Sequence, residues 1–212
     1  MTDANNLKNS WIETRNRLVA KALLGGSLAS LSVRCPNEDK MWFGLVTDEQ
    51  PVLVDRQAHG AGEPASLHAA TYKLRGDVGA IALGAGAFGA LMAGFNGMMP
   101  QLFDEQARHI GPMPQPIDRK SRLESALRPG GNVLLWGGLP LCLGITYTRL
   151  ALNAELFEKC AKAYVLAAAT GGRIKSLPWW VRRIANGRLA KDQARAQAAF
   201  ARGELPTESR GY

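Results

Sequence analysis

The sequence has few cysteines and no long apolar run. Its three cysteines, Cys35, Cys142 and Cys160, lie neither in close pairs nor at the spacing of metal ligands, so neither a disulfide framework nor a zinc knuckle is expected. The longest apolar stretch, residues 78–95, is interrupted by glycine, and the first 17 residues contain nothing like a signal peptide. We therefore predict a cytoplasmic protein with reduced, buried thiols.

Acidic residues are scarce near the C-terminus. The net charge is +8, and residues 173–202 contain eight Lys and Arg side chains against one acid, Asp192. Such a segment attracts anions, but stacking aromatic residues are not interleaved with its cations, as nucleic-acid binding favours. We interpret it as a solvated helix face and expect neither nucleic acid nor a membrane as partner. The adjacent Trp179 and Trp180 then suit docking within an oligomer.

Hydrophobic residues make up 46% and charged residues 21% of 212 residues, which is typical of one folded domain. Apolar spacing predicts helices, and short apolar or alternating runs between glycines predict strands. The predicted helices are residues 7–24, 66–74, 87–94, 102–110, 119–127 and 147–169, with a last basic helix after Pro178. The predicted strands are residues 30–34, 41–46, 52–54, 78–83 and 132–136.

Histidine is as scarce as cysteine, with only His59, His68 and His109 in the chain. His109 is the most suggestive, because Glu105 precedes it by four residues and would share its helix face. Such a pair could transfer protons or begin a metal site, although it could equally be a surface pair. With the neighbouring Asp104, these two residues are our catalytic candidates from spacing alone.

Several segments stand in an order that resembles the class II aldolase/adducin family. Residues 29–34, Ala-Ser-Leu-Ser-Val-Arg, are similar to the family's Gly-Asn-x-Ser-x-Arg segment. Residues 67–80 resemble its Leu-His-x-x-x-Tyr-x-x-Arg-Pro-Asp-Val-x-Ala block almost residue for residue. Residues 132–137 look like the strand after the family's His-Gly pair, and residues 154–169 look like its Glu-containing closing helix. The whole resemblance covers roughly residues 10–170.

The resemblance implies an α/β fold, a single-domain three-layer α/β/α structure with a mostly antiparallel central sheet. It divides the chain into a class II aldolase/adducin-like domain, residues 1–172, and a basic C-terminal helix with a mobile tail, residues 173–212. It also implies a homo-oligomer, a tetramer with sites at its subunit interfaces. His68 matches a helix position on the packing side, so we interpret it as structural.

In the family a divalent metal held by a His-x-His pair and a third histidine polarises the substrate, and a glutamate moves the proton. The resemblance places the pair on Leu83 and Ala85, the third ligand on about Gly131 and the glutamate on about Pro64. None of these residues can bind a metal or carry a proton. Glu63, beside Pro64, becomes the fourth catalytic candidate, and we expect no metal and no cofactor.

Four further residues are candidates for binding a substrate. Ser30 stands where the family has a phosphate-binding Asn, Ser32 follows it on the same strand, and Arg34 and Arg75 could anchor a carboxylate.

A different hypothesis starts from residues 84–89, Gly-Ala-Gly-Ala-Phe-Gly. These match the G-x-G-x-x-G pattern of dinucleotide sites between a predicted strand and a predicted helix, and the acidic Asp104 follows about 20 residues on. The pattern is weak in a chain with 23 glycines, and the expected βαβ unit is not evident around it. The aldolase-like frame explains the same segment as the former His-x-His turn.

The sequence therefore leaves two principal hypotheses. In the first, which we prefer, the protein is a non-catalytic or ligand-binding oligomer subunit that has lost the metal-dependent aldehyde-lyase mechanism. In the second, it is a metal-independent lyase, decarboxylase or isomerase of a small oxygenated acid or a sugar-derived substrate. Whether the chain is an enzyme is left open.

Overall fold

The computed structural model describes residues 4–57 and 62–208. The helices are α1 (Ala4–Ala20), α2 (Glu63–Leu74), α3 (Asp104–His109), α4 (Leu123–Leu127), α5 (Tyr147–Ala169) and α6 (Trp179–Ala201). Two short 3-10 helices, η1 (Ala90–Phe95) and η2 (Lys120–Arg122), accompany them. The strands are β1 (Gly25–Arg34), β2 (Lys40–Leu45), β3 (Val52–Asp55), β4 (Ala80–Ala85), β5 (Val133–Trp136) and β6 (Leu139–Gly144).

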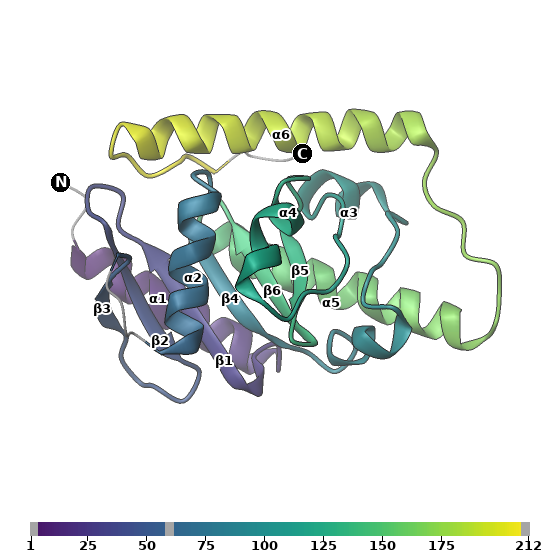
Figure 1. Ribbon diagram of the computed structural model, residues 1–212, viewed down its shortest axis with the longest axis horizontal. Helices are drawn as coiled ribbons and strands as arrows, with labels where there is room; N and C mark the ends of the chain where they lie inside the picture. The colour runs from purple at the N-terminus through teal and green to yellow at the C-terminus, as the bar shows by residue number, and fades with distance from the viewer. Residues whose placement is uncertain (1–3, 58–61, 209–212) are drawn as a thin grey trace.

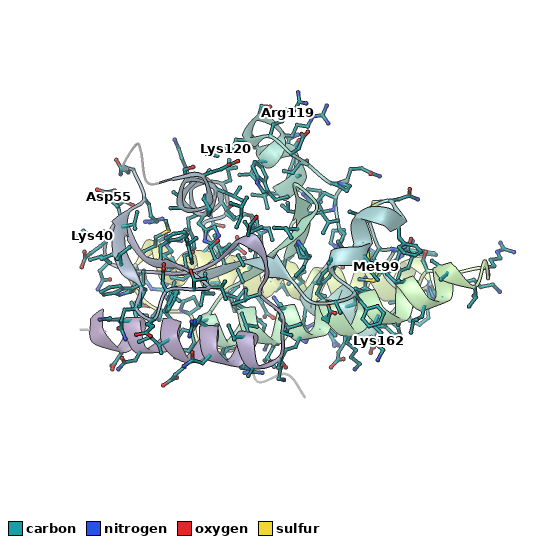
Figure 2. The ribbon with its side chains drawn as sticks, turned by 90° about the horizontal axis from the view of Figure 1, so that it is seen from below. Lys40, Asp55, Met99, Arg119, Lys120 and Lys162 are labelled. Atoms are coloured by element: carbon teal, nitrogen blue, oxygen red, sulfur yellow. The ribbon has the colours of Figure 1, made fainter. Side chains whose placement is uncertain are left out.

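The six strands form one sheet in the order β3-β2-β1-β4-β6-β5, and each neighbouring pair runs antiparallel. Helices cover both faces, so the chain is one α/β/α domain with an antiparallel sheet, which confirms the predicted fold class (Figure 1). Figure 2 shows the layers from another side, with Lys162 of α5 and Lys120 near α2 on opposite sides of the sheet.

The alternation of side chains along the strands divides the core between the two faces. On β4, Ala80 and Ala82 belong to the apolar cluster that includes residues of α1 and α5. Ile81 and Leu83 point the other way, into the cluster that includes residues of α2 and α4. The three cysteines are buried and unpaired, as predicted.

Helix α6 lies along one edge of the molecule, across the ends of several strands (Figure 1). Its Phe200 ring packs 4.3 Å from the guanidinium of Arg34, the last residue of β1. The same ring explains the glycine before β4, because a Cβ on Gly79 would lie 2.9 Å from Phe200 and 2.3 Å from the carbonyl oxygen of Ile145. Strand ends on this side of the sheet are therefore closed by α6.

The sequence pattern did not reveal strand β6, which pairs with both β4 and β5 in the sheet. The sequence signal for this strand is the Gly137-Gly138 pair. These glycines have φ of 53° and 87°, as the two central residues of a tight β-hairpin require. The predicted helix over residues 87–94 is instead the 3-10 helix η1. Within the described residues no helix is long and apolar enough to cross a membrane.

Candidate functional site

The predicted metal-ligand positions Leu83 and Ala85 lie at the C-terminal end of β4, and both are buried. Leu83 is opposite Leu141 of β6, which is opposite Leu134 of β5, so three leucines form a row across the sheet. All three belong to one apolar cluster with the buried Trp136. Hydrocarbon side chains thus occupy the two positions to which the resemblance assigns the metal-binding His-x-His pair of the family.

The predicted third ligand position, Gly131, is wrong. A single ion needs its ligands to converge, but Gly131 precedes β5, three residues before Leu134 in the row with Leu83. Three residues of strand put Gly131 about 10 Å from that row, toward the end of the sheet where β4 begins. The turn at Gly137 and Gly138, after Trp136, lies at the correct end of the sheet, and glycine offers no metal-binding side chain there.

Glu63 and Pro64 form the first turn of α2, and Glu63 is exposed. One exposed carboxylate, together with Leu83, Ala85 and the glycines of the turn, is no donor set for a zinc-type or manganese-type ion. The residues at this end of the sheet therefore do not fit the metal of the aldolase mechanism. Across residues 4–57 and 62–208, no three His, Cys, Asp or Glu side chains gather in a way that could hold a metal ion.

The glycine-rich turn after β4 binds a carboxylate of its own chain. Glu158 of α5 accepts hydrogen bonds from the backbone N–H groups of Phe88, at 2.7 Å, and Gly89, at 2.9 Å. A Cβ on Gly86 would lie 2.4 to 2.7 Å from the Glu158 carboxyl group, so glycine is required for this approach. The G-x-G-x-x-G spacing is thus explained by Glu158, which occupies the donors that a cofactor phosphate would use.

Ser30 and Ser32, two of the predicted substrate-binding residues, are completely buried between the sheet and α2. His68 lies against both hydroxyl groups, with its Nδ1 2.8 Å from Ser32 Oγ and its Nε2 3.3 Å from Ser30 Oγ. The phenol of Tyr72 is 2.9 Å from Ser32 Oγ. These polar groups satisfy one another in the core, and burial lowers the pKa of His68 to about 3. Their role here is packing.

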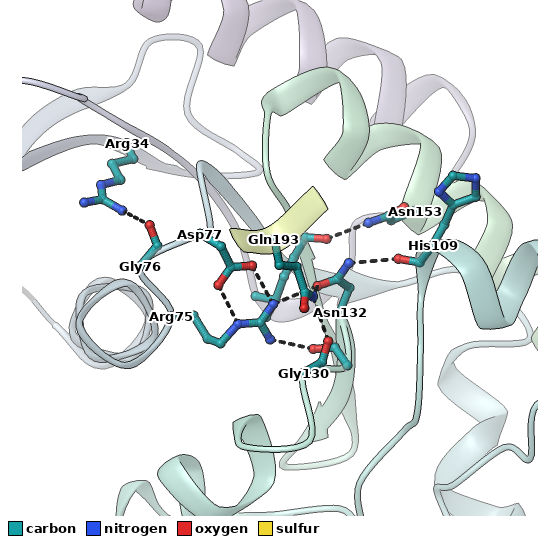
Figure 3. A network of polar contacts seen from close by, with 11 residues as sticks. Arg34, Arg75, Gly76, Asp77, His109, Gly130, Asn132, Asn153 and Gln193 are labelled. Carbon is teal, nitrogen blue, oxygen red and sulfur yellow. Dashed lines mark hydrogen bonds and ion pairs between the residues drawn. The ribbon is translucent and has the colours of Figure 1, made fainter. Parts of the chain in front are cut away.

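Arg75, another predicted substrate-binding residue, is the centre of a buried polar network (Figure 3). Its Nε and Nη2 donate to the two carboxylate oxygens of Asp77, each at 2.7 Å. Its Nη1 donates to the carbonyl oxygen of Gly131 at 2.8 Å, and Nη2 also reaches Asn132 Oδ1 at 3.1 Å. The guanidinium therefore joins the end of α2 to the beginning of β5. Arg75 also lines a cleft of about 440 Å³ beside α6, but its Nε and both Nη atoms are engaged by these partners.

The network continues from Asn132 to two more helices (Figure 3). Asn132 Nδ2 donates to the carbonyl oxygen of His109, at the end of α3, at 2.8 Å. Gln193 of α6 donates from Nε2 to the carbonyl oxygen of Gly130 at 2.8 Å and to Asn132 Oδ1 at 3.2 Å. Arg34, the remaining substrate-binding candidate, lies apart, where it donates to the carbonyl oxygen of Gly76 and packs on Phe200.

His109 and Glu105 line one cleft of about 480 Å³ between α3 and α5. Four residues of α5 complete its polar lining: Arg149, Asn153, Lys159 and Glu155, whose carboxylate pairs with Arg17 and Lys21 of α1 and the turn after it. The common helix face of the two candidates, predicted from their spacing, is therefore present in the structure. Asp104 is exposed at the start of α3 and is not part of the lining.

Glu63 does not join the other catalytic candidates, because α2 contacts β1 and α4 whereas α3 contacts α5 and α6. The helix that carries Glu63 thus packs on the opposite face of the sheet from the cleft. His59 lies outside the described residues.

The imidazole of His109 is held in its neutral form. Burial and the nearby positive charges of Arg149 and Arg108 lower the pKa of His109 to about 4. Arg149 Nη1 is 3.4 Å from His109 Nδ1, and a guanidinium can only donate, so Nδ1 accepts and we assign the proton to Nε2. A neutral imidazole of this kind can donate a hydrogen bond from Nε2 to an oxygen in the cleft.

The polar residues around His109 include some that the sequence did not single out. Glu208 pairs with Arg149 at 3.3 Å and also accepts from the hydroxyl of Thr146, so this part of the predicted mobile tail contacts the body of the domain. Asn153 is completely buried. No local pattern marks these residues, because their partners are distant in the sequence. The signal that the sequence does offer is a polar residue such as Asn153 on an otherwise apolar helix face.

A family-model comparison and a search of curated proteins both find no match for this chain. Solved structures do match, and the fold they share with the chain is that of class II aldolases. At the identities found, of 14 to 20%, the likeness shows the fold alone.

Three of the similar structures illustrate how complete the match is. An L-fuculose 1-phosphate aldolase superposes with a TM-score of 0.73 at 20% identity, over 89% of this chain and 98% of its own. YgbL from Escherichia coli, a putative aldolase/epimerase/decarboxylase, gives 0.70 at 16% identity, over 85% of this chain and 98% of its own. An aldolase II superfamily protein from Pseudomonas syringae gives 0.68 at 14% identity, over 98% and 97%.

Removing the guanidinium at the centre of the polar network should destabilise the protein strongly. In Arg75→Ala, Asp77 is left buried without its partner, and we expect the free energy of unfolding to fall by about 3 to 5 kcal/mol. Arg128→Ala is the matched control, because its ion pair with Glu124 is over 70% exposed on both sides, whereas Arg75 and Asp77 are 8% exposed. Urea unfolding should show a change below about 0.5 kcal/mol for the control. Equal losses in the two variants would contradict the role assigned to Arg75.

Acidification should destabilise the fold through His68. Its folded pKa of about 3 lies below the ordinary value of 6.5, so the unfolded chain binds the proton more readily and stability falls as pH decreases from 6.5 toward 3. Between about pH 7 and about pH 5, His68 alone should cost about 2 kcal/mol of unfolding free energy. Urea unfolding at both values should give a correspondingly smaller pH difference for His68→Gln. The same pH difference in that variant would show that His68 is not the titrating group.

Proposed function

We propose that this protein is a class II aldolase/adducin-like chain that has lost the metal-dependent aldehyde-lyase mechanism and acts as a ligand-binding subunit of a cytoplasmic homo-oligomer. The observation that carries the proposal is the apolar row of Leu83, Leu141 and Leu134 at the end of the sheet where the metal ligands would converge. Two electrostatic facts support it.

First, a metal ion at this end would have to replace the hydration shell that it loses with protein ligands, and Leu83 and Ala85 supply none. Desolvating an ion against hydrocarbon without compensation is strongly unfavourable. Second, the backbone donors of the adjacent turn are already occupied by Glu158, which leaves them unable to hold a substrate phosphate without displacing it. The segment from Leu83 to Gly89 therefore opposes both the binding of the metal and the binding of a substrate phosphate.

On this proposal residues 1–172 form the aldolase-like body, and residues 173–212 form a basic extension whose helix α6 docks on it. The exposed Trp179 and Trp180 at the start of α6 provide apolar surface for a neighbouring subunit. A tetramer is the assembly that the resemblance implies.

A second candidate function is favoured by the cleft between α3 and α5. There the neutral imidazole of His109 lies with the carboxylate of Glu105 beside Arg149, a combination that can hold a carboxylate and move a proton without a metal. The corresponding activity is a metal-independent lyase, decarboxylase or isomerase reaction on a small oxygenated acid or a sugar-derived substrate. Loss of that activity in His109→Gln, with metal chelation having no effect, is the expected result if this candidate is correct.

The proposed function is tested by the metal content and mass of the protein, purified without a histidine tag. Because the apolar row offers no ligand atoms, we expect under about 0.1 metal ion per chain by mass spectrometry, against the one expected of a three-histidine site. Light scattering on the same sample should give the mass of an oligomer. Near-stoichiometric zinc, manganese or iron would contradict the loss of the metal site, and a monomer would contradict the role as an oligomer subunit.

A further inference from the structure

The N-terminus of α5 holds a carboxylate supplied by the chain's own tail. Thr146 is the N-cap of this 23-residue helix, and its hydroxyl oxygen accepts the backbone N–H of Arg149 at 3.0 Å. The hydroxyl proton is then directed to Glu208, whose second carboxylate oxygen lies 3.3 Å from Arg149 Nη2. A helix N-terminus, a hydroxyl and a guanidinium together favour a negative charge at this point.

An independent observation in the adjoining cleft points to a ligand. Asn153, one helical turn after Arg149, is completely buried in the cleft lining. Its Nδ2 donates to the carbonyl oxygen of Leu143 at 2.8 Å, which fixes the orientation of the amide, yet its Oδ1 has no hydrogen-bond partner among the described residues. A buried acceptor without a donor is costly, so a group that donates to Asn153 Oδ1 would bind favourably.

His109 supplies a second contact of defined direction. Its Nδ1 faces Arg149, so its Nε2 is the donor that remains for a ligand oxygen. Figure 3 shows His109 and Asn153 at the same side of the polar network, and both line the cleft. The side chains of Leu152 and Leu156 give the cleft an apolar wall. The lining therefore suits a short carbon chain with a carboxylate and a hydroxyl group.

We propose that the cleft between α3 and α5 binds a small hydroxy acid, and that Glu208 of the chain's own tail competes with it. The ligand carboxylate pairs with Arg149, and its hydroxyl group donates to Asn153 Oδ1. Because Glu208 is tethered, it competes at a high effective concentration and sets the affinity for external acids. This inference rests on the ligand-binding role proposed above and names the ligand class.

The competition is tested with the full-length protein and glycerate as probe, with binding measured by isothermal titration calorimetry. In Glu208→Gln the carboxylate at position 208 is removed, and we expect glycerate to bind about three-fold more tightly or better. Glu204→Gln is the matched control, because this nearby tail carboxylate pairs with the exposed Arg202 and should leave the affinity unchanged. Equal affinities of the wild type and Glu208→Gln would refute the competition.

The site itself is tested with one further variant and one further ligand. Arg149→Gln should weaken glycerate binding about ten-fold, since a charge-assisted contact is lost. Propionate, which has no hydroxyl group to donate to Asn153, should bind the wild-type protein about ten-fold more weakly than glycerate. Undiminished binding by Arg149→Gln, or equal affinities for the two acids, would overturn the assignment.

The outcomes separate this inference from the proposed function. If neither the wild type nor Glu208→Gln binds glycerate while the protein contains no metal, the hydroxy-acid site is wrong and the metal-free proposal stands. If the protein contains stoichiometric metal but glycerate affinity still depends on Arg149 and Glu208, the cleft is correct and the proposed loss of the metal site is wrong.

Discussion

The bidentate ion pair between Arg75 and Asp77 is the interaction on which much of the remaining structure depends. The Arg75 guanidinium also binds the backbone just before β5, and Asn132 extends the contact to α3 and α6. Buried charges are tolerated only when they are paired and hydrogen-bonded, so these elements must meet in one arrangement. The position of His109, and with it the cleft between α3 and α5, follows from this constraint.

The two ends of the sheet have different chemical characters. At the end where β4 finishes, leucine side chains and the Glu158 carboxylate occupy the space and the donors that a metal and a phosphate would need. At the other end, Arg149, Asn153 and His109 line a cleft. On the proposed function, the class II aldolase fold is kept while its usual reaction centre is apolar, and the remaining polar chemistry lies beside α5.

Much of the fold could be predicted from the sequence, because residues 67–80 carry a specific resemblance and local periodicity marks most helices. The roles of individual residues could not. Ser32 and Arg75 match positions that suggested ligand binding, yet both satisfy core partners, since a polar side chain in sequence gives no sign of its burial. Glu158 and Glu208 act on segments about 60 to 70 residues away, and no local spacing predicts such contacts.

If the position of the aldolase metal has become part of the apolar core, metals should not stabilise the folded protein, and thermal unfolding with and without metals measures this. A ligand that binds only the folded state raises the melting temperature. We expect the same melting temperature in chelator as in excess zinc, manganese, cobalt or iron(II). A metal-dependent rise that chelator reverses would contradict it and would require a metal site in the folded protein.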